Sequence, residues 1–258
     1  AKSVSDFWTV EGDTSYSEFS CRTSPDGLSP VDMLVVATKV HQTASAQAWF
    51  QALVDQDTVV LVVQNGVEHR ATVAPFVPEE TEIAAGIIDV PASRRRPGDI
   101  EVSRSGTLSL PDDAAGRAAR RWLGETRILT KIEARSDFAE VMWRKLAVNV
   151  ISGSVPALTD RSAGVFREPE IEAMCRQLIR ESLAVAAASG VSLPSHTIRG
   201  FRAADPNALG SMLKDRRAGR TLEADARNGA VARLGRRLGV DTPYNAAVAA
   251  LAGAVNRA

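Results

Sequence analysis

Two short runs of apolar residues near the start of the chain have the pattern of buried strands. Residues 33–37 and 59–63 are continuously apolar and rich in β-branched side chains, as in strands covered on both faces of a parallel sheet. Between them, residues 43–54 carry apolar side chains at helical spacing. We therefore expect a strand, a helix and a second strand, joined by a right-handed crossover.

Further strands are expected after this unit. The pattern favours a third strand at residues 81–88. Apolar and polar residues alternate over residues 100–103 and 107–110, on either side of Ser105-Gly106, which predicts an antiparallel hairpin added to the sheet. A helix at residues 114–123 and a strand at 127–132 complete the predicted α/β region.

The hydrophobic pattern changes near residue 136. Beyond it, apolar residues recur at helical spacing and strand signals are absent. The predicted helices cover residues 138–155, 168–188, 196–202, 208–216, 221–238 and 243–257. We therefore divide the chain into an α/β domain at residues 1–136 and a helical domain at residues 137–258.

The composition is typical of a soluble globular protein without overall charge. Lysine plus arginine equals aspartate plus glutamate, at 31 each, so no basic field is available to attract nucleic acid or an anionic membrane. No apolar run approaches the roughly 18 residues of a membrane span. The cysteines have no metal-ligand spacing, and His41 and His69 are expected at the surface. We expect a cytosolic protein with no metal and no nucleic-acid or membrane partner.

The start of the chain departs from the usual order of a nucleotide-binding sheet. Such a domain normally opens with a strand, a glycine-rich turn and a helix whose N-terminus holds the diphosphate. No GxGxxG sequence stands before Lys39, and residues 7–13 have the pattern of a strand and hairpin from the middle of such a domain. We expect the first strand-helix unit, roughly 30 residues long, to be absent from this chain.

Lys145 is the first candidate for chemistry. On a helix it shares one face with Asn149 and Gly153, while Trp143 and Leu146 lie on another face that can pack inward. A lysine in a partly desolvated cleft can protonate a ketone oxygen as hydride reaches the carbon, and its charge stabilises the developing alkoxide. From local spacing alone, a solvated lysine on an amphipathic helix is the simpler explanation.

A second polar group lies nearer the C-terminus. Ser211 and Asp215 are four residues apart, and Glu223 opens the next predicted helix after a polar linker. The helix dipole alone explains an acidic residue in a first helical turn. The functional alternative is that Glu223 positions Lys145 or a substrate hydroxyl.

Five separated motifs, taken in order, resemble the ketopantoate reductase (2-dehydropantoate 2-reductase) family over nearly the whole chain. They are Ala37-Thr38-Lys39 with Gln42, Gln64-Asn65-Gly66, the WRKLAVN sequence at residues 143–149, the SMLKD sequence at residues 211–215, and Glu223 with Asn228-Gly229 and residues 239–245. Any one motif would be weak, but their common order is specific. The resemblance implies an α/β Rossmann-type parallel-sheet domain, N-terminally incomplete here, followed by an all-α C-terminal domain.

The resemblance also implies a reaction and its residues. The family reduces 2-dehydropantoate to pantoate with NADPH, in pantothenate and coenzyme A synthesis, and residues 1–136 would bind NADP while residues 137–258 hold the substrate. Lys145 matches the catalytic lysine and Glu223 the acid beside the catalytic centre. The matched cofactor-binding positions are Lys39, Gln42 and Asn65, and the matched substrate-binding positions are Asn65, Asn149 and Ser211.

Two places depart from the family pattern. Where the family usually has Asn-Pro and later Asn-Gly, this chain has Gly153-Ser154 and Ala163-Gly164. Lost amide contacts change specificity more than hydride transfer, so a reductase of another 2-oxo acid is one alternative. A non-catalytic protein that has lost its cofactor turn is another. The alanine-rich last helix could form the surface of a homodimer.

Overall fold

The computed structural model describes residues 2–10, 13–96, 99–102, 105–123, 129–194, 201 and 205–257. The chain divides into two compact units. Unit 1 comprises Ala1–Thr38, Gln42–Gln64 and His69–Phe138, and unit 2 comprises Lys39–His41, Asn65–Glu68 and Ala139–Ala258. Unit 2 therefore includes two short segments that follow strands of unit 1.

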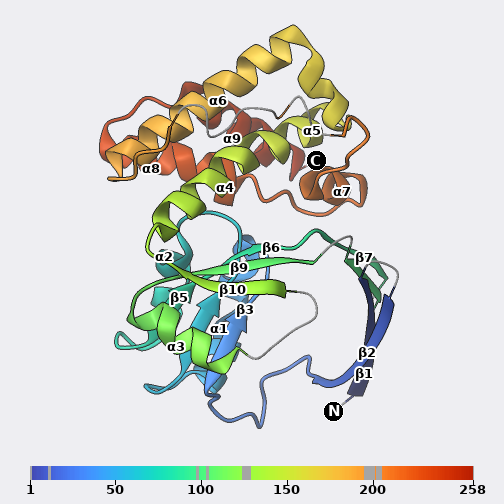
Figure 1. Cartoon of the computed structure of the whole chain (residues 1–258), viewed down its shortest axis with the longest axis vertical. Helices are drawn as coiled ribbons and strands as arrows, with labels where there is room; N and C mark the ends of the chain where they lie inside the picture. The colour runs from blue at the N-terminus through green and yellow to red at the C-terminus, as the bar shows by residue number, and fades with distance from the viewer. Residues whose placement is uncertain are drawn as a thin grey trace. The chain divides into compact units, whose positions relative to one another are not determined.

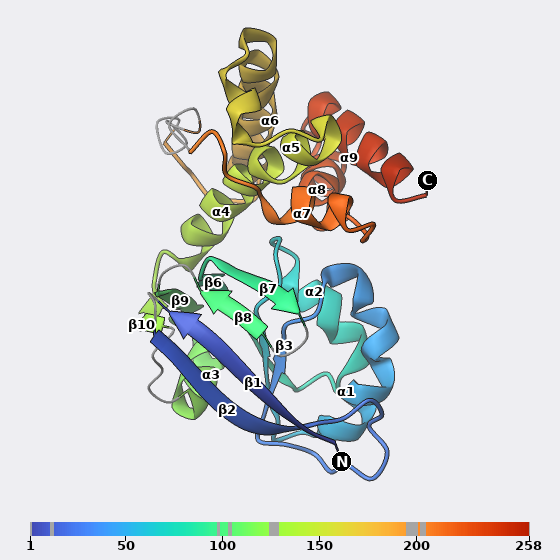
Figure 2. The ribbon, with the colours of Figure 1, turned by 90° about the vertical axis from the view of Figure 1, so that its right-hand side faces the viewer.

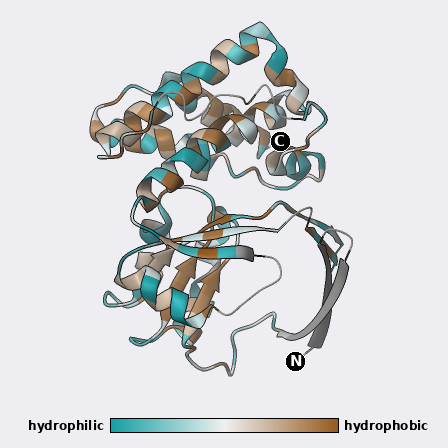
Figure 3. Cartoon of the chain, in the orientation of Figure 1, coloured by the Kyte–Doolittle hydropathy of each residue, from teal (hydrophilic) through white to brown (hydrophobic). Residues whose placement is uncertain are grey.

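Unit 1 is built on a parallel sheet of strands β3 (Met33–Val36), β4 (Val59–Val62) and β5 (Glu82–Ala85), in the order β3-β4-β5 (Figure 1). All of β4 is buried, and Figure 3 colours the sheet as hydrophobic. Leu61 packs in one cluster with helix α3, whereas Val60 and Val62 pack in another with helix α1. The central strand β4 is covered on both faces, as its apolar run predicted, because successive side chains point to opposite sides. The edge strand β3 is not, since Val35 is 45% exposed.

Helix α1 (Gln47–Leu53) begins without a side-chain cap, whereas α3 (Ala114–Trp122) begins at a capping residue. The Asp113 side chain accepts the backbone N–H of Gly116 at 2.8 Å and so caps α3. Phe50 of α1 stacks on Phe76, with the ring centroids 5.8 Å apart. The shorter helical segments are 3-10 turns at Val40–Gln42, Ala44–Ala46 and Ala74–Phe76, and helix α2 (His69–Val73).

The remaining strands form two further sheets. One has the order β10-β9-β6, from β6 (Ile87–Asp89), β9 (Gly106–Pro111) and β10 (Leu129–Arg135). The other has the order β2-β1-β8-β7, from β1 (Lys2–Val10), β2 (Asp13–Cys21), β7 (Ala92–Arg96) and β8 (Asp99–Val102), as Figure 2 shows. The hairpin expected near the start of the chain is present as the antiparallel pair β1 and β2.

Three sequence predictions for unit 1 are wrong. The single strand predicted at residues 81–88 is divided into β5 and β6, which belong to different sheets. The hairpin predicted over residues 100–110 does not form, because β8 pairs with β1 and β7 while β9 pairs with β6 and β10. Alternating residue types indicate a strand but not its partner. His69, expected at the surface, is buried, and its Nε2 lies 2.8 Å from the carbonyl oxygen of Gln64. A polar ring can be buried there because that carbonyl provides a partner.

In the described part of the chain, every element after β10 is helical, which confirms the predicted fold class. The elements are α4 (Phe138–Ser152), α5 (Ser154–Thr159), a 3-10 turn at Ala163–Arg167, α6 (Pro169–Ala188), α7 (Ser211–Arg217), a π-helical segment at Asp225–Gly229, α8 (Ala230–Leu238) and α9 (Pro243–Val255). The helix predicted at residues 196–202 lies, apart from residue 201, outside the described residues. None of the described helices is both long enough and apolar enough to cross a membrane.

The orientation of α4 is set by its apolar face. Trp143 and Leu146, predicted to point inward, are buried in the main core of unit 2, together with Val150 of the same helix. Lys145 and Asn149 are each half-buried on α4. Because residues four apart lie one above the other on a helix, the packed face fixes the direction of this polar pair.

Candidate active site

Polar side chains from five segments of unit 2 are connected by hydrogen bonds and ion pairs. The polar cluster, as we call it, consists of Lys39 and Asn65 from the segments after β3 and β4, Asn149 from α4, Asp215 from α7, and Glu223 and Arg227 from the segment before α8. Four of these six residues, Lys39, Asn65, Asn149 and Glu223, are candidates from the sequence. The fold thus brings Lys39 and Glu223, which are 184 positions apart, into direct contact.

Lys39 lies between the two carboxylates of the cluster. Its Nζ donates to Oδ2 of Asp215 at 2.9 Å and to Oε2 of Glu223 at 3.2 Å. The Lys39 side chain is 35% exposed, whereas those of Asp215 and Glu223 are 7% and 3% exposed. Buried carboxylates need such a partner, because an unpaired charge away from water is costly. Lys39 therefore compensates both acids while part of its side chain remains accessible.

Asp215 is held in its ionised form by its neighbours. Burial raises the pKa of its carboxyl group, but the hydrogen bonds from Lys39 and Arg220 outweigh burial and leave the pKa below its ordinary value. Arg220 Nε donates to Oδ1 of Asp215 at 2.9 Å, opposite the oxygen that accepts from Lys39. Both carboxylate oxygens are thus engaged, which fixes the position of Lys39 through Asp215.

We predict that Asp215→Asn lowers the free energy of unfolding by about 1.5–3 kcal/mol at neutral pH, the usual range for hydrogen bonds to a charged group. Because the folded pKa lies below the unfolded value of about 3.9, this contribution is complete above that value and is lost as the pH falls through the folded pKa. Urea unfolding of both proteins from about pH 7 to about pH 3 measures it. A difference that stayed constant over this range would contradict the assignment.

Glu223 is the centre of the cluster. Its Oε2 accepts from Lys39 and, at 3.2 Å, from Nδ2 of Asn65. Asn65 Oδ1 in turn accepts from Nδ2 of Asn149 at 3.4 Å. The Asn65 side chain therefore connects Asn149 on α4 to Glu223, in addition to the position of Asn65 in the turn after β4. Gly66 completes that turn at φ +109, where an added Cβ would lie 2.8 Å from the carbonyl oxygen of Ala226.

Arg227 is the functional candidate that the sequence reasoning missed. Its Nη2 lies 3.3 Å from Oγ of Ser211 and 3.6 Å from Oε2 of Glu223. The available signal was the spacing of Glu223 and Arg227, four residues apart, which places both on one helical face. The π-helical segment Asp225–Gly229 contains Arg227, and such segments are frequent at functional sites.

Lys145 lies one helical turn before Asn149 on α4 and is half-buried. The Asn149 side chain reaches the cluster through Asn65. Side chains at this spacing lie on the same helix face, so α4 directs Lys145 to the side on which Asn149 meets Asn65. Ser211 is exposed and contacts the cluster through Arg227.

A buried hydrogen-bond network holds the backbone behind the cluster. Asn228 accepts from the Ser154 hydroxyl and donates to the carbonyl oxygen of Val150 at 3.1 Å and to Oδ1 of Asn245 at 3.0 Å. Asn245 donates to Oε2 of Glu181 at 2.7 Å. These contacts join α4, α5, α6 and α9 to the segment that carries Glu223 and Arg227. Every member is buried, and a buried polar network holds its residues in place when its groups are paired, as they are in these contacts.

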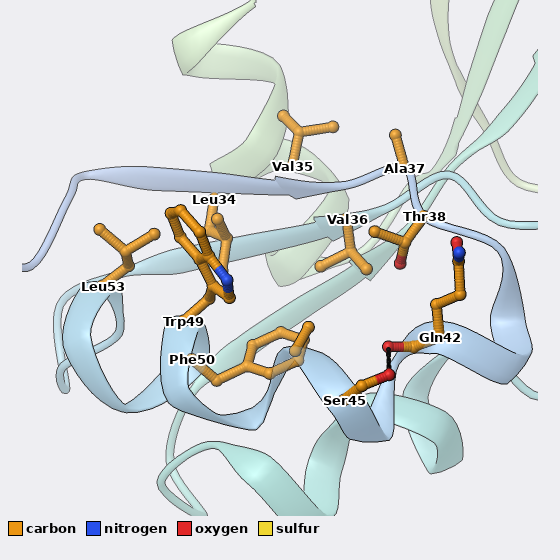
Figure 4. A pocket seen from close by; sticks show the side chains of 11 residues that line it. Leu34, Val35, Val36, Ala37, Thr38, Gln42, Ser45, Trp49, Phe50 and Leu53 are labelled. Carbon is orange, nitrogen blue, oxygen red and sulfur yellow. Dashed lines mark hydrogen bonds between the residues drawn. The ribbon is translucent and has the colours of Figure 1, made fainter. Parts of the chain in front are cut away.

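Unit 1 has a separate hollow of about 420 Å³ beside β3 and α1 (Figure 4). Its apolar side includes Val36, Trp49 and Leu53, and its polar end carries Thr38 and Gln42. Gln42, a predicted cofactor-binding residue, thus lies next to the carboxyl end of a parallel strand, whereas Lys39 and Asn65 belong to unit 2. Apolar walls with a few polar groups are typical of small-molecule sites.

Two family models match the chain. The one described as "Ketopantoate reductase PanE/ApbA" matches residues 5–114, and "Ketopantoate reductase PanE/ApbA C terminal" matches residues 137–256. The 2-dehydropantoate 2-reductase of Caulobacter vibrioides is 40% identical over 235 residues, covering 89% of this chain and 79% of the relative. The similarity therefore includes both the sheet region and the helical region.

Solved structures give the same result for the fold. A ketopantoate reductase from Staphylococcus aureus, described as dimeric, has a TM-score of 0.85 and 22% identity, covering 99% of this chain and 88% of its own. A D-mandelate dehydrogenase in complex with NADH has a TM-score of 0.79 and 26% identity, covering 89% of this chain and 79% of its own. At 22% identity, the first likeness concerns the fold alone.

Proposed function

Because the chain belongs to the ketopantoate reductase family, we propose that it reduces 2-dehydropantoate to pantoate, with NADPH as the reductant, in pantothenate and coenzyme A synthesis. The observation that carries this proposal is the polar cluster. Lys39, Asn65, Asn149 and Glu223, which match the family's cofactor, substrate and acid positions, are linked by hydrogen bonds. A chance set of solvated polar residues would not be linked in this way.

A nicotinamide cofactor supplies the hydride when it is bound. The residues present fit such a group, because open α/β sheets bind nucleotides at the carboxyl ends of their strands. Lys39, Gln42 and Asn65 follow two neighbouring parallel strands, and Gln42 and Trp49 both line the hollow. We assign the cofactor contacts to these three residues, cofactor binding to residues 1–136, and substrate binding to residues 137–258.

The remaining roles belong to side chains of the helical region. Lys145 Nζ donates a proton to the 2-oxo oxygen while hydride reaches C2, so that a hydroxyl group forms and the lysine is left neutral until solvent protonates it again. Its positive charge stabilises the developing alkoxide. Asn149 and Ser211 bind the substrate, with Asn65 beside them. Glu223 is the acid of the catalytic centre and holds Lys39 and Asn65 in place.

A second candidate substrate is another 2-oxo acid. The chain has Gly153 and Ala163 where the family usually has asparagine, which removes two amide contacts. D-mandelate dehydrogenase, a structural relative at 26% identity, is named for a different 2-hydroxy acid. This observation favours a change of specificity within one reaction type.

The substrate and cofactor are tested by steady-state kinetics of the natural full-length protein. The panel comprises 2-dehydropantoate, 2-oxoisovalerate and benzoylformate, each with NADPH and with NADH. We expect the highest kcat/KM with 2-dehydropantoate and NADPH. A higher value for another acid would transfer the assignment to that acid, and saturable binding of NADPH without turnover of any acid would indicate a non-catalytic member of the family.

We also propose that the protein forms a homodimer through α9. The Staphylococcus aureus relative is described as dimeric. Helix α9 is rich in alanine and exposes Leu251 and Tyr244, which are 59% and 44% exposed. Sedimentation equilibrium of the wild-type protein and of Leu251→Glu tests the proposal, because a charge at that position should shift a dimer to monomer.

A further inference from the structure

Arg227 is a buried cation whose donors are only partly used. Its side chain is 4% exposed, and its Nε has no hydrogen-bond partner among the residues that the structure describes. A guanidinium carries five N–H donors, and a buried donor without an acceptor is costly. Buried polar groups usually have a partner, and this open donor lies on a charged side chain of the polar cluster, so an acceptor from outside the chain would satisfy it.

Glu223 does not fully satisfy Arg227. The same oxygen, Oε2, accepts from Lys39 and Asn65 at 3.2 Å each, whereas Nη2 of Arg227 lies 3.6 Å away. That separation allows electrostatic attraction but is too long for a good hydrogen bond. The cluster together with Arg220 contains three cations, Lys39, Arg220 and Arg227, and two carboxylates. One positive charge is therefore left to be matched by an anion.

Gly153 provides the space in which the guanidinium lies. A Cβ at this position would overlap Nη1 of Arg227 and would lie 2.8 Å from Sδ of Met212. Gly153 stands between α4 and α5 and is itself buried, so neither helix can move aside easily. Any larger side chain at this position could not coexist with this placement of Arg227.

The guanidinium is linked to an exposed residue by one hydrogen bond. Nη2 donates to the hydroxyl of Ser211 at 3.3 Å, and Ser211 is exposed at the start of α7. A ligand that reaches Ser211 can therefore reach the next group inward, Arg227. The planar fork of an arginine matches the two oxygens of a carboxylate better than any other side chain does.

We propose that Arg227 binds the carboxylate of the 2-oxo acid substrate, with the Ser211 hydroxyl as its second contact and Gly153 as the residue that makes room for it. This inference rests on the proposed reduction of a 2-oxo acid and names the group that selects an acid over a neutral ketone. A substrate without the carboxylate would leave the guanidinium partly unpaired.

The test compares an acid with a neutral form of the same molecule. Arg227→Met and Gly153→Ala are assayed with 2-dehydropantoate and with its uncharged lactone, and pantoate binding is measured by calorimetry. We expect KM for the acid and Kd for pantoate to rise about 10- to 100-fold in both variants, as for a lost charge-assisted contact. Turnover of the lactone should change less than about threefold. Arg227→Lys, which keeps the charge but not the fork, should recover part of the loss.

Gly253→Ala is the matched control, because its new Cβ would meet only Nη1 of Arg257, at an unstrained 3.5 Å. It should leave both ligands unaffected. Unchanged binding of pantoate in Arg227→Met and Gly153→Ala would overturn the inference, as would equal losses for acid and lactone, since a structural role affects both. A wild-type protein that binds 2-oxo acids through Arg227 but reduces none would refute the proposed function and leave this inference intact.

Discussion

Lys145→Ala is expected to lower kcat by about 10²–10⁴-fold, the usual contribution of a general acid. The alanine variant cannot protonate the 2-oxo oxygen or stabilise its developing charge. KM for the acid should change much less, because the carboxylate is bound by other groups. Steady-state kinetics with 2-dehydropantoate and NADPH measure both constants. This split between kcat and KM distinguishes a proton donor from a residue that only binds the substrate.

Lys131→Ala is the control for this prediction. Lys131 lies on β10 with its side chain 64% exposed and pairs with Glu133 of the same strand at 2.6 Å. Its removal should leave kcat unchanged. A Lys145→Ala protein that kept wild-type turnover would remove Lys145 from the mechanism, whatever the role of the polar cluster.

The second large effect is expected for Asn228→Ala, which should lower the free energy of unfolding by about 2–4 kcal/mol. The substitution removes the partner of three buried groups, namely the Ser154 hydroxyl, the Val150 carbonyl oxygen and Oδ1 of Asn245. Each unpaired buried group costs about 1–3 kcal/mol, and relaxation of the structure offsets part of this cost. Urea unfolding monitored by far-UV circular dichroism measures the change.

Asn207→Ala is the matched control, because Asn207 is exposed and its side chain can hydrogen-bond to water. Substitutions at such positions usually change stability by less than about 0.5 kcal/mol. If the two alanine variants unfolded at the same urea concentration, the buried network would not stabilise the segment that carries Glu223 and Arg227.

The buried strands were the most predictable part of the fold. The apolar runs at residues 33–37 and 59–63 became β3 and β4. The run of β4 reflects burial on both faces, whereas β3 is an edge strand whose Val35 is exposed. The inward face of α4 was equally predictable, since Trp143 and Leu146 recur at helical spacing. Both patterns depend only on which side chains are buried, and the order of apolar residues along the sequence shows this directly.

Strand pairing and local helix geometry could not be read in the same way. Residues 99–102 alternate like a hairpin strand, yet their partners are β1 and β7, and the choice is made by contacts far away in sequence. The helix predicted at residues 221–238 contains a π-helical segment, which depends on how Gly229 and Ala224 pair along the backbone. Neither feature leaves a periodic signature in the sequence.

The resemblance to ketopantoate reductases is confirmed, but the geometry of the site goes beyond it. The motifs named Lys39, Asn65, Asn149 and Glu223 without showing that Lys39 pairs with both Asp215 and Glu223. Arg227 was missed because the sequence pattern does not distinguish a buried arginine from an exposed one on a helix, and only the structure shows it next to Gly153. The roles of all the candidate site residues stay predictions.

The most direct test of the proposed reaction follows the hydride itself. NADPH carrying deuterium at the transferable position of its nicotinamide ring is incubated with 2-dehydropantoate and the natural full-length protein, and the product is analysed by mass spectrometry. We predict pantoate with a single deuterium bound to C2. Pantoate free of deuterium, or no pantoate at all under conditions in which the Caulobacter vibrioides relative forms it, would contradict the proposed function.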